Sequence, residues 1–133
     1  MKFNGLVPEL SVTHIDASKN FYVEVLGFKM EYERIEDSFV FLSLGEAQIM
    51  LEEINGNWNT AELQHPFGRG INFQIESKDV EGLAAGIRKK NVVLFRDVFV
   101  SHYECGGQMI TEKEILVQDP DGYLLRFSET IGG

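Results

Sequence analysis

The sequence contains very little cysteine, no long apolar run and few basic side chains. Its single cysteine, Cys105, excludes an internal disulfide framework and is typical of a reducing compartment. No segment reaches the roughly 18 consecutive apolar residues that cross a bilayer, and the start of the chain leads into strand-like alternation rather than an apolar signal core. We therefore expect a cytoplasmic protein with no membrane partner.

The shortage of basic residues gives the chain a strongly acidic balance. Twelve Lys and Arg stand against 21 Asp and Glu, for a formal charge of -9. The resulting field repels phosphate backbones and attracts cations, so we expect no nucleic-acid partner. An acidic balance also keeps cytoplasmic proteins soluble, and charge alone does not choose between that role and a cationic ligand.

Length and composition indicate one compact globular domain. The chain has 133 residues, of which 44% are hydrophobic and 25% charged. These are ordinary globular values, and a chain of this length buries about two thirds of the surface that its unfolded form exposes. We expect a single domain over residues 1–133 that folds alone or as a small oligomer.

Hydrophobic periodicity predicts a strand, a helix and three more strands in the first half of the chain. Residues 6–13 alternate with period two, whereas residues 16–26 carry apolar side chains at helical spacing and stop at Gly27. Strands are predicted at residues 28–35, 38–44 and 47–54. Residues 6–54 therefore form one β-α-β-β-β module.

The same order of elements returns after a polar connecting loop at residues 55–69. A strand carrying Ile71, Phe73 and Ile75 precedes a helix at 79–89, and strands follow at 92–100, 114–118 and 123–128. The run Asp119-Pro120-Asp121-Gly122 predicts a tight turn before the last strand. The second module, 70–129, repeats the first at an offset of about 64 residues, which predicts an α+β fold made by internal duplication.

Alternation in the strands also predicts which side chains face the helices. The helix-facing set is Leu10, Val12, Val40, Leu42, Ile49, Leu51, Phe73, Ile75, Leu125 and Phe127. The opposite face then carries Glu9, Ser11, Phe39, Phe41, Gln48, Met50, Glu52, Asn72, Gln74, Leu124 and Arg126. A solvated sheet face and a partly wet ligand cleft both fit this mixture, and the apolar members favour the cleft.

Four motifs follow one another along the chain: Ser18-Lys19-Asn20-Phe21-Tyr22, Leu26-Gly27-Phe28, Gly68-Arg69-Gly70-Ile71-Asn72-Phe73 and the closing hairpin at 117–129. Together they resemble the vicinal-oxygen-chelate superfamily, which includes glyoxalase I, extradiol dioxygenases, fosfomycin-modifying transferases and bleomycin resistance proteins. The resemblance covers essentially the whole chain. It implies two paired β-α-β-β-β modules in a curved eight-stranded mixed sheet, with a cavity inside and the helices outside.

The metalloenzymes of that superfamily bind a divalent ion through His or Gln, Glu, His and Glu on four strands. The matching positions here are Val7, Met50, Gly70 or Asn72, and Arg126. A catalytic site typically needs at least three protein ligands, which this set does not supply. The resemblance therefore implies a protein with no metal, no cofactor and no catalytic residues, which binds its ligand rather than transforming it.

The nearest branch by resemblance is that of the bleomycin resistance proteins, homodimers that sequester a cationic glycopeptide drug. Glu36-Asp37-Ser38-Phe39 resembles the segment in which those proteins stack an aromatic on the drug, and that role falls to Phe39. Their second stacking aromatic aligns near Thr111, so Trp58 or Tyr103 must replace it. The carboxylates that could attract the drug are Glu9, Glu31, Glu33, Glu36, Asp37, Glu52, Glu53 and Glu62.

We expect a ligand site made of Phe39, Phe41, Met50, Glu52, Trp58, Tyr103 and Arg126. Arg126 either binds an anionic group or, as we favour, pairs with Glu52 or Glu9, because a buried guanidinium needs an acceptor. Trp58 is either a recognition aromatic or a loop anchor. Two alternatives to drug sequestration stay open: a divalent-metal glyoxalase or dioxygenase with misaligned ligands, and a binding module for another amphipathic cation.

The remaining candidates are expected to have structural roles. His65, His102 and Cys105 fall in predicted irregular segments without metal-ligand spacing. His14 is predicted at the surface, and Gly106-Gly107 as a turn. Pro8 suits an edge strand, and by resemblance it marks a hinge for exchanging the first strand between the subunits of a dimer.

Overall fold

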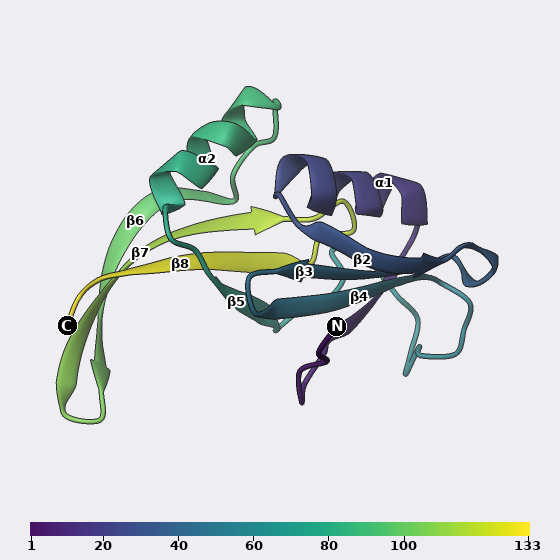
Figure 1. The fold of residues 1–133 in the computed structure, drawn as a ribbon, viewed down its shortest axis with the longest axis horizontal. Helices are drawn as coiled ribbons and strands as arrows, with labels where there is room; N and C mark the ends of the chain where they lie inside the picture. Colours follow the sequence, from purple (N-terminus) through teal and green to yellow (C-terminus); the bar gives the residue numbers. More distant parts are fainter. The chain divides into compact units, whose positions relative to one another are not determined.

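The computed structural model describes all residues from Met1 to Gly133. The chain divides into two compact units. The first consists of Met1–Phe67 with Asp119–Gly122, and the second of Gly68–Gln118 with Tyr123–Gly133. Each unit contains one four-stranded mixed sheet and one helical segment, drawn in Figure 1. None of the helices is long and apolar enough to span a membrane.

The first unit has the predicted β-α-β-β-β order. Its strands are β1 (Glu9–Val12), β2 (Lys29–Arg34), β3 (Phe39–Leu44) and β4 (Ala47–Glu53). Helix α1 (Ile15–Asn20) continues into a π-helical turn over Phe21–Val25, and a short 3-10 turn over Ile35–Asp37 joins β2 to β3. The sheet order is β1-β4-β3-β2, with β1 parallel to β4 and the other pairs antiparallel.

The second unit repeats this arrangement. Its elements are β5 (Asn72–Glu76), α2 (Val80–Lys89), β6 (Arg96–Cys105), β7 (Gln108–Gln118) and β8 (Leu124–Gly132), in the sheet order β5-β8-β7-β6. Strand β5 is parallel to β8, as β1 is to β4. The α+β class and the eight strands in two β-α-β-β-β modules are confirmed.

The predicted helix-facing side chains form the cores of the two units. In the first, Leu10, Val12, Val40, Leu42, Ile49 and Leu51 are buried, as are Phe21, Tyr22 and Leu26 of the helical segment. In the second, Ile75, Leu125 and Phe127 are buried together with Val80, Ala84 and Ile87 of α2. Phe73 is half-buried. Each fully buried large apolar side chain contributes about 1.5–3 kcal/mol relative to exposure, so the period-two pattern fixes the orientation of both sheets.

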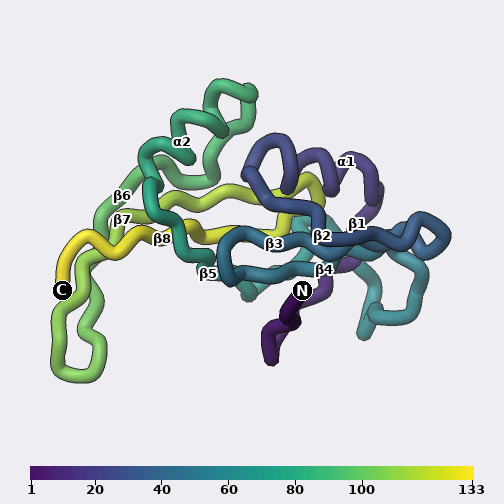
Figure 2. The backbone as a smooth tube through the Cα atoms, viewed as in Figure 1, coloured from purple at the N-terminus to yellow at the C-terminus, as the bar shows by residue number.

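The hairpin of β6 and β7 differs most from expectation. Both strands are longer than predicted and meet at Gly106 and Gly107, which have φ of +59° and +91° and form the predicted turn. Figure 2 shows this hairpin extending past the other strands of its sheet. The assignment of His102 and Cys105 to irregular segments was wrong, since both lie on β6. Residues 102–109 are exposed, and a strand with two solvated faces carries no hydrophobic alternation.

The predicted turn at Asp119–Gly122 is confirmed, and it belongs to the first unit. The amide of Gly122 donates to the carbonyl of Asp119 at 2.9 Å, which closes the turn, and Gly122 has a φ of +96°. The hydroxyl of Tyr22 donates to Asp119 Oδ2 at 2.8 Å, and the amide of Thr13 donates to Asp121 Oδ2 at 3.0 Å. The buried carboxylates of the turn therefore hold Thr13, just before α1, and Tyr22, in the π-helical turn.

Candidate ligand-binding site

Two rows of side chains cross the face of the first sheet that lies opposite α1. Strand register places Glu9, Met50, Phe41 and Tyr32 in one row. The second row consists of Ser11, Glu52, Phe39 and Arg34. Neighbours within such a row have Cβ atoms about 5 Å apart and contact one another directly. Four of the predicted ligand residues, Phe39, Phe41, Met50 and Glu52, thus share this face.

The aromatic residues on this face have close protein neighbours. Tyr32 stacks on Phe41 with ring centroids 5.3 Å apart and an angle of 14° between the planes, and Phe3 packs edge-on against Phe41. The guanidinium carbon of Arg34 lies 3.8 Å from the centroid of the Phe39 ring. Phe39 is only 3% exposed as a result. Tyr32 and Arg34 were missed from the sequence because the assignment of faces left out the strand that carries them.

A pocket of about 530 Å³ opens beside this face, where the ends of β3 and β4 meet two loops. It is lined by Glu36, Asp37, Ser38, Glu52, Glu53, Ile54, Asn55 and Asn57. Four of these eight residues are carboxylates and none is a lysine or arginine. We call this the acidic pocket. Carboxylates gathered in this way attract cations, which raises the local concentration of a cationic ligand and the rate at which it is captured.

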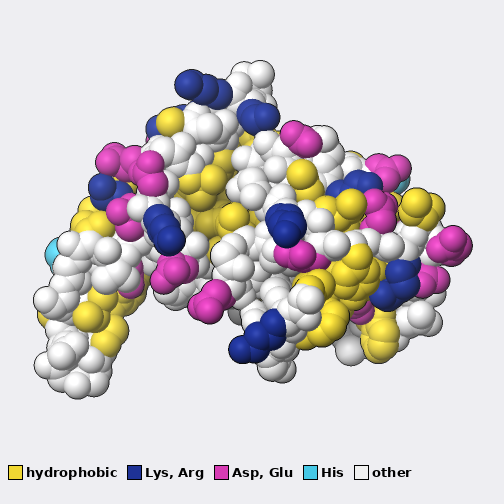
Figure 3. All heavy atoms as spheres, viewed as in Figure 1, with side chains coloured by type: hydrophobic (Ala, Val, Ile, Leu, Met, Phe, Trp, Pro, Cys, Tyr) yellow, Lys and Arg dark blue, Asp and Glu magenta, His cyan; other side chains and the backbone are white.

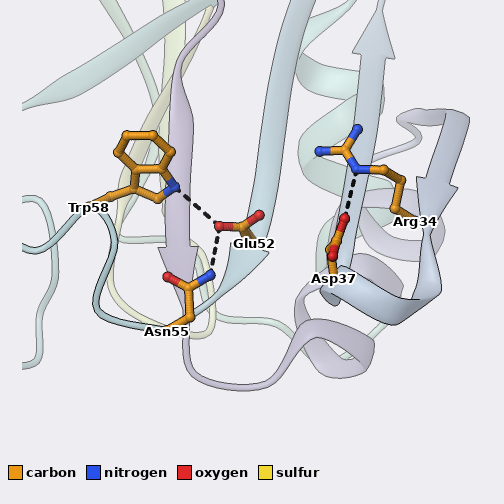
Figure 4. Close-up of polar contacts among 5 residues, drawn as sticks. All are labelled: Arg34, Asp37, Glu52, Asn55 and Trp58. Atoms are coloured by element: carbon orange, nitrogen blue, oxygen red, sulfur yellow. Dashed lines mark hydrogen bonds and ion pairs between the residues drawn. The ribbon is translucent and has the colours of Figure 1, made fainter.

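Glu52 is the carboxylate around which the wall of the acidic pocket is organised. Its Oε1 accepts hydrogen bonds from Asn55 Nδ2 at 2.9 Å and from Trp58 Nε1 at 3.1 Å, and Figure 4 shows both donors converging on this oxygen. The indole of Trp58 is 63% exposed. The hydrogen bond fixes one edge of the ring and leaves most of the ring surface exposed. Trp58 can therefore anchor its loop and still present its ring to a ligand.

Glu9 and Arg34 set the electrostatics of the face beside the pocket. Partial burial raises the pKa of Glu9, the nearby charge of Glu52 raises it further, and Arg34 acts in the opposite direction. Arg34 Nε also donates to Asp37 Oδ2 at 3.1 Å, as Figure 4 shows. The guanidinium of Arg34 thus acts on two carboxylates, through its charge on Glu9 and through an ion pair with Asp37.

The two remaining predicted residues, Tyr103 and Arg126, meet in the second unit around a carboxylate that the sequence did not single out. The hydroxyl of Tyr103 donates to Glu114 Oε1 at 2.6 Å, and Arg126 Nη1 lies 3.6 Å from Glu114 Oε2. Arg126 Nη2 donates to Gln74 Oε1 at 2.9 Å. Glu114 has 0% exposure.

Arg126 was expected to pair with Glu52 or Glu9, which belong to the first unit. Within its own unit its ionic partner is Glu114 on β7, the strand next to its own. Arg126 lies directly opposite Leu116, which makes Glu114 its diagonal neighbour on the same face. Choosing this carboxylate among 21 acidic residues requires the register of β7 on β8, which alternation alone does not provide.

Residues 5–127 match the family model of the Glyoxalase/Bleomycin resistance protein/Dioxygenase superfamily. The chain belongs to this superfamily. The match covers nearly the whole chain and confirms the resemblance drawn from the sequence motifs. No curated protein matches the chain.

Three solved structures align with most of the chain. A superfamily member from Vibrio splendidus 12B01 is 35% identical and covers 92% of this chain and 95% of its own, with a TM-score of 0.43. A glyoxalase/bleomycin resistance protein/dioxygenase from Alicyclobacillus acidocaldarius is 18% identical, covers 96% and 92%, and has a TM-score of 0.67. TioX from Micromonospora sp. ML1 is 16% identical, and the alignment covers 97% of this chain and 100% of TioX, with a TM-score of 0.72. The last two support the fold alone.

The superfamily's metal positions do not fit a divalent ion in this chain. Val7 and Gly70 offer no donor atom, Met50 offers a soft thioether, and Asn72 offers a single amide oxygen. Arg126 is a cation already paired with Glu114. Within either unit, no group of three His, Cys, Asp or Glu side chains is placed to hold a metal ion.

Proposed function

We propose that this protein sequesters a cationic, amphipathic small molecule and releases it unchanged. The observation that carries the proposal is the acidic pocket, in which Glu36, Asp37, Glu52 and Glu53 gather without a lysine or arginine in the lining. A bound cation would neutralise carboxylates that otherwise repel one another. Among ligands of this class we propose bleomycin-type cationic glycopeptide drugs, so that the cellular role is antibiotic resistance.

The aromatic side chains around the pocket support an amphipathic ligand rather than a simple ion. The exposed indole of Trp58 is held beside Glu52, so a flat ring resting on it would bring an attached cation close to that carboxylate. Each good aromatic stacking contact adds about 0.5–1.5 kcal/mol beyond the buried area. A ligand with a flat tail and a positive charge would use both features together.

Binding without catalysis is the other half of the proposal. The superfamily's metalloenzymes activate their substrates through a metal, and the corresponding side chains here are unsuited to ligating one. Arg126 supports this reasoning, because its guanidinium pairs with Glu114 and donates to Gln74, so it links strands of the second sheet. We further propose that the protein acts as a homodimer in the cytoplasm, as the bleomycin resistance branch does.

Calorimetric titration with metal-free bleomycin tests the ligand directly. Saturable binding that weakens as salt rises is expected, because the attraction is largely between partly exposed charges. Glu52→Gln should weaken binding by about fivefold, the equivalent of roughly 1 kcal/mol for a partly screened ion pair. Glu24→Gln makes the same charge change at an exposed residue outside the pocket and should leave affinity unchanged.

Two outcomes would remove this proposal. No heat of binding at high micromolar drug would exclude bleomycin as the ligand. Stoichiometric nickel, zinc, iron or manganese in the purified protein, with turnover that a chelator abolishes, would favour a metalloenzyme of the glyoxalase or dioxygenase type instead. Sedimentation equilibrium tests the dimer, and a monomer at all concentrations would contradict it.

A further inference from the structure

Arg34 places a planar cation against the aromatic ring that we assigned to ligand stacking. Its guanidinium carbon lies 3.8 Å from the centroid of Phe39, and its Nε donates to Asp37 Oδ2 at 3.1 Å. The guanidinium therefore makes the two contacts expected of a cationic ligand here, a ring face and a carboxylate of the acidic pocket.

We propose that Arg34 is an internal stand-in for the ligand, and that the site selects a planar, delocalised cation that takes its place on Phe39. Suitable groups are a guanidinium, an amidinium or a cationic aromatic ring. The inference rests on the proposed function, because it names the chemical class that the acidic pocket accepts. It also makes Arg34 the residue that sets selectivity, since any ligand that stacks on Phe39 must first displace it.

Arg34 is held by contacts that a ligand can replace. Its side chain is 48% exposed and that of Asp37 is 57% exposed, so water screens their ion pair. Exposed ion pairs are among the weakest interactions in a folded protein, and a cation–π contact weakens where water reaches the cation. The side chain is also long and flexible, and it can turn towards solvent without movement of the sheet. Displacement then needs only a ligand that restores the same two contacts.

The surface beneath Arg34 is already built to receive such a ligand. Phe39 lies directly opposite Glu52 on β4, so its ring borders the wall of the acidic pocket. On its other side, Tyr32 lies with its ring centroid 6.0 Å from that of Phe39. Movement of Arg34 would thus join an aromatic floor to a pocket lined with carboxylates. A planar cation covers the floor with its face, whereas a tetrahedral ammonium meets it with a few hydrogens.

The chain contains a matched pair for comparison. Arg96 lies over Phe99 in the second sheet, with its guanidinium carbon 3.7 Å from the ring centroid, nearly the same spacing as in the first sheet. Arg34 binds Asp37 and Phe39 lies opposite Glu52, and both of these partners line the acidic pocket. Arg96 and Phe99 instead lie opposite Leu116 and Glu114, which do not line it. Loss of Arg96 therefore removes the same charge from an aromatic ring without opening the proposed site.

The experiment measures the affinities of benzamidinium and cyclohexylammonium, two cations of equal charge of which only the first is planar. Binding to the full-length protein is followed by NMR titration at low salt. The natural protein should prefer benzamidinium. Arg34→Ala should tighten benzamidinium binding roughly tenfold, while cyclohexylammonium gains no more than about twofold from the lost positive charge. Arg96→Ala should change neither affinity.

Equal gains for both cations in Arg34→Ala would show that Arg34 acts by charge alone and would overturn the inference, as would the same gains in Arg96→Ala. Adding Phe39→Leu to Arg34→Ala should abolish the preference for benzamidinium, and a preference that persists would place the planar cation elsewhere. If Arg34→Ala unfolds, Arg34→Gln provides the same test. If bleomycin does not bind but the benzamidinium results are as expected, the drug is excluded and this inference stands. If bleomycin binds but Arg34→Ala does not favour benzamidinium, the proposed function stands and this inference is excluded.

Discussion

Replacing Arg126 with methionine tests whether burial, rather than distance, sets the strength of an ion pair in the second sheet. Arg126 Nη1 lies 3.6 Å from Glu114 Oε2, and the two side chains are 27% and 1% exposed. Methionine keeps much of the length of the side chain and removes its charge. The carboxylate of Glu114 would then be buried without a countercharge and would keep the hydrogen bond from the hydroxyl of Tyr103.

Breaking a fully buried pair costs about 3–5 kcal/mol, and the partial exposure of Arg126 brings the expected loss below that range, to about 2–3 kcal/mol. For a chain of this length that loss lowers the melting temperature by about 8–12 °C. Urea unfolding, followed by fluorescence and circular dichroism, measures it directly. Adding Glu114→Gln to Arg126→Met should recover at least about 1 kcal/mol, because the neutral amide no longer needs a countercharge.

The ion pair of Lys113 and Glu81 provides the control. Its atoms are closer, at 3.1 Å, but the side chains are 24% and 67% exposed. Lys113→Met should therefore cost less than about 1 kcal/mol. A loss for Lys113→Met equal to that for Arg126→Met, or a neutral Arg126→Met, would refute the argument that burial decides.

Two further predictions concern the turn and the polar face of the first unit. Gly122→Ala should destabilise the protein by about 2 kcal/mol or more, since a Cβ there would lie 2.5 Å from Cβ of Pro66 at a φ of +96°. Gly86→Ala, with open space on α2, should instead stabilise the protein by about 0.5–1 kcal/mol. Thermal unfolding compares the two variants, and equal effects would contradict the steric argument. Glu9 has a pKa raised by burial and by Glu52, so it binds a proton more tightly when folded, and its contribution to stability falls as pH rises through that pKa. Glu9→Gln should therefore raise the melting temperature at pH 7, with a gain that vanishes below pH 4.5; a gain that is the same at both pH values would exclude titration of Glu9 as the cause.

The architecture was predictable because each of its determinants is local. Period-two alternation in β1, β3 and β4 oriented the first sheet, and the burial of residues such as Leu42 and Leu51 agrees with that pattern. Asp119 to Gly122 predicted a turn from the conformations that proline and glycine favour. The full length of the hairpin of β6 and β7 was not predicted, because its exposed residues show no alternation of apolar and polar side chains.

The interior of the helical segment was predicted only in outline. Apolar spacing indicated one helix over residues 16–26, whereas the structure changes from an α-helix to a π-helical turn at Phe21. The amide of Leu26 donates to the carbonyl of Phe21 at 3.1 Å, a bond that spans five residues. Hydrophobic spacing does not distinguish these two helical forms over a single turn.

The contacts of the candidate site depend on the register of neighbouring strands, which could not be predicted from the sequence. The face of β3 and β4 was assigned by alternation, which brought Phe39 and Glu52 together correctly. Arg34 was missed because its position over Phe39 follows from the pairing of β2 with β3, which contains an irregularity between Met30 and Tyr32. Glu114 was missed for the same kind of reason, since only the alignment of β7 on β8 sets it beside Arg126.

The placement of the turn at Asp119–Gly122 means that the two repeats are not interchangeable pieces. A fragment ending at Phe67 would keep every strand of the first sheet, yet Tyr22 and Thr13 would lose the carboxylates that they bind 97 and 108 positions further along the chain. The first repeat is thus completed by a turn that lies beyond most of the second repeat in the sequence. Tyr22 and Thr13 acquire these hydrogen bonds only once that distant turn has folded against them.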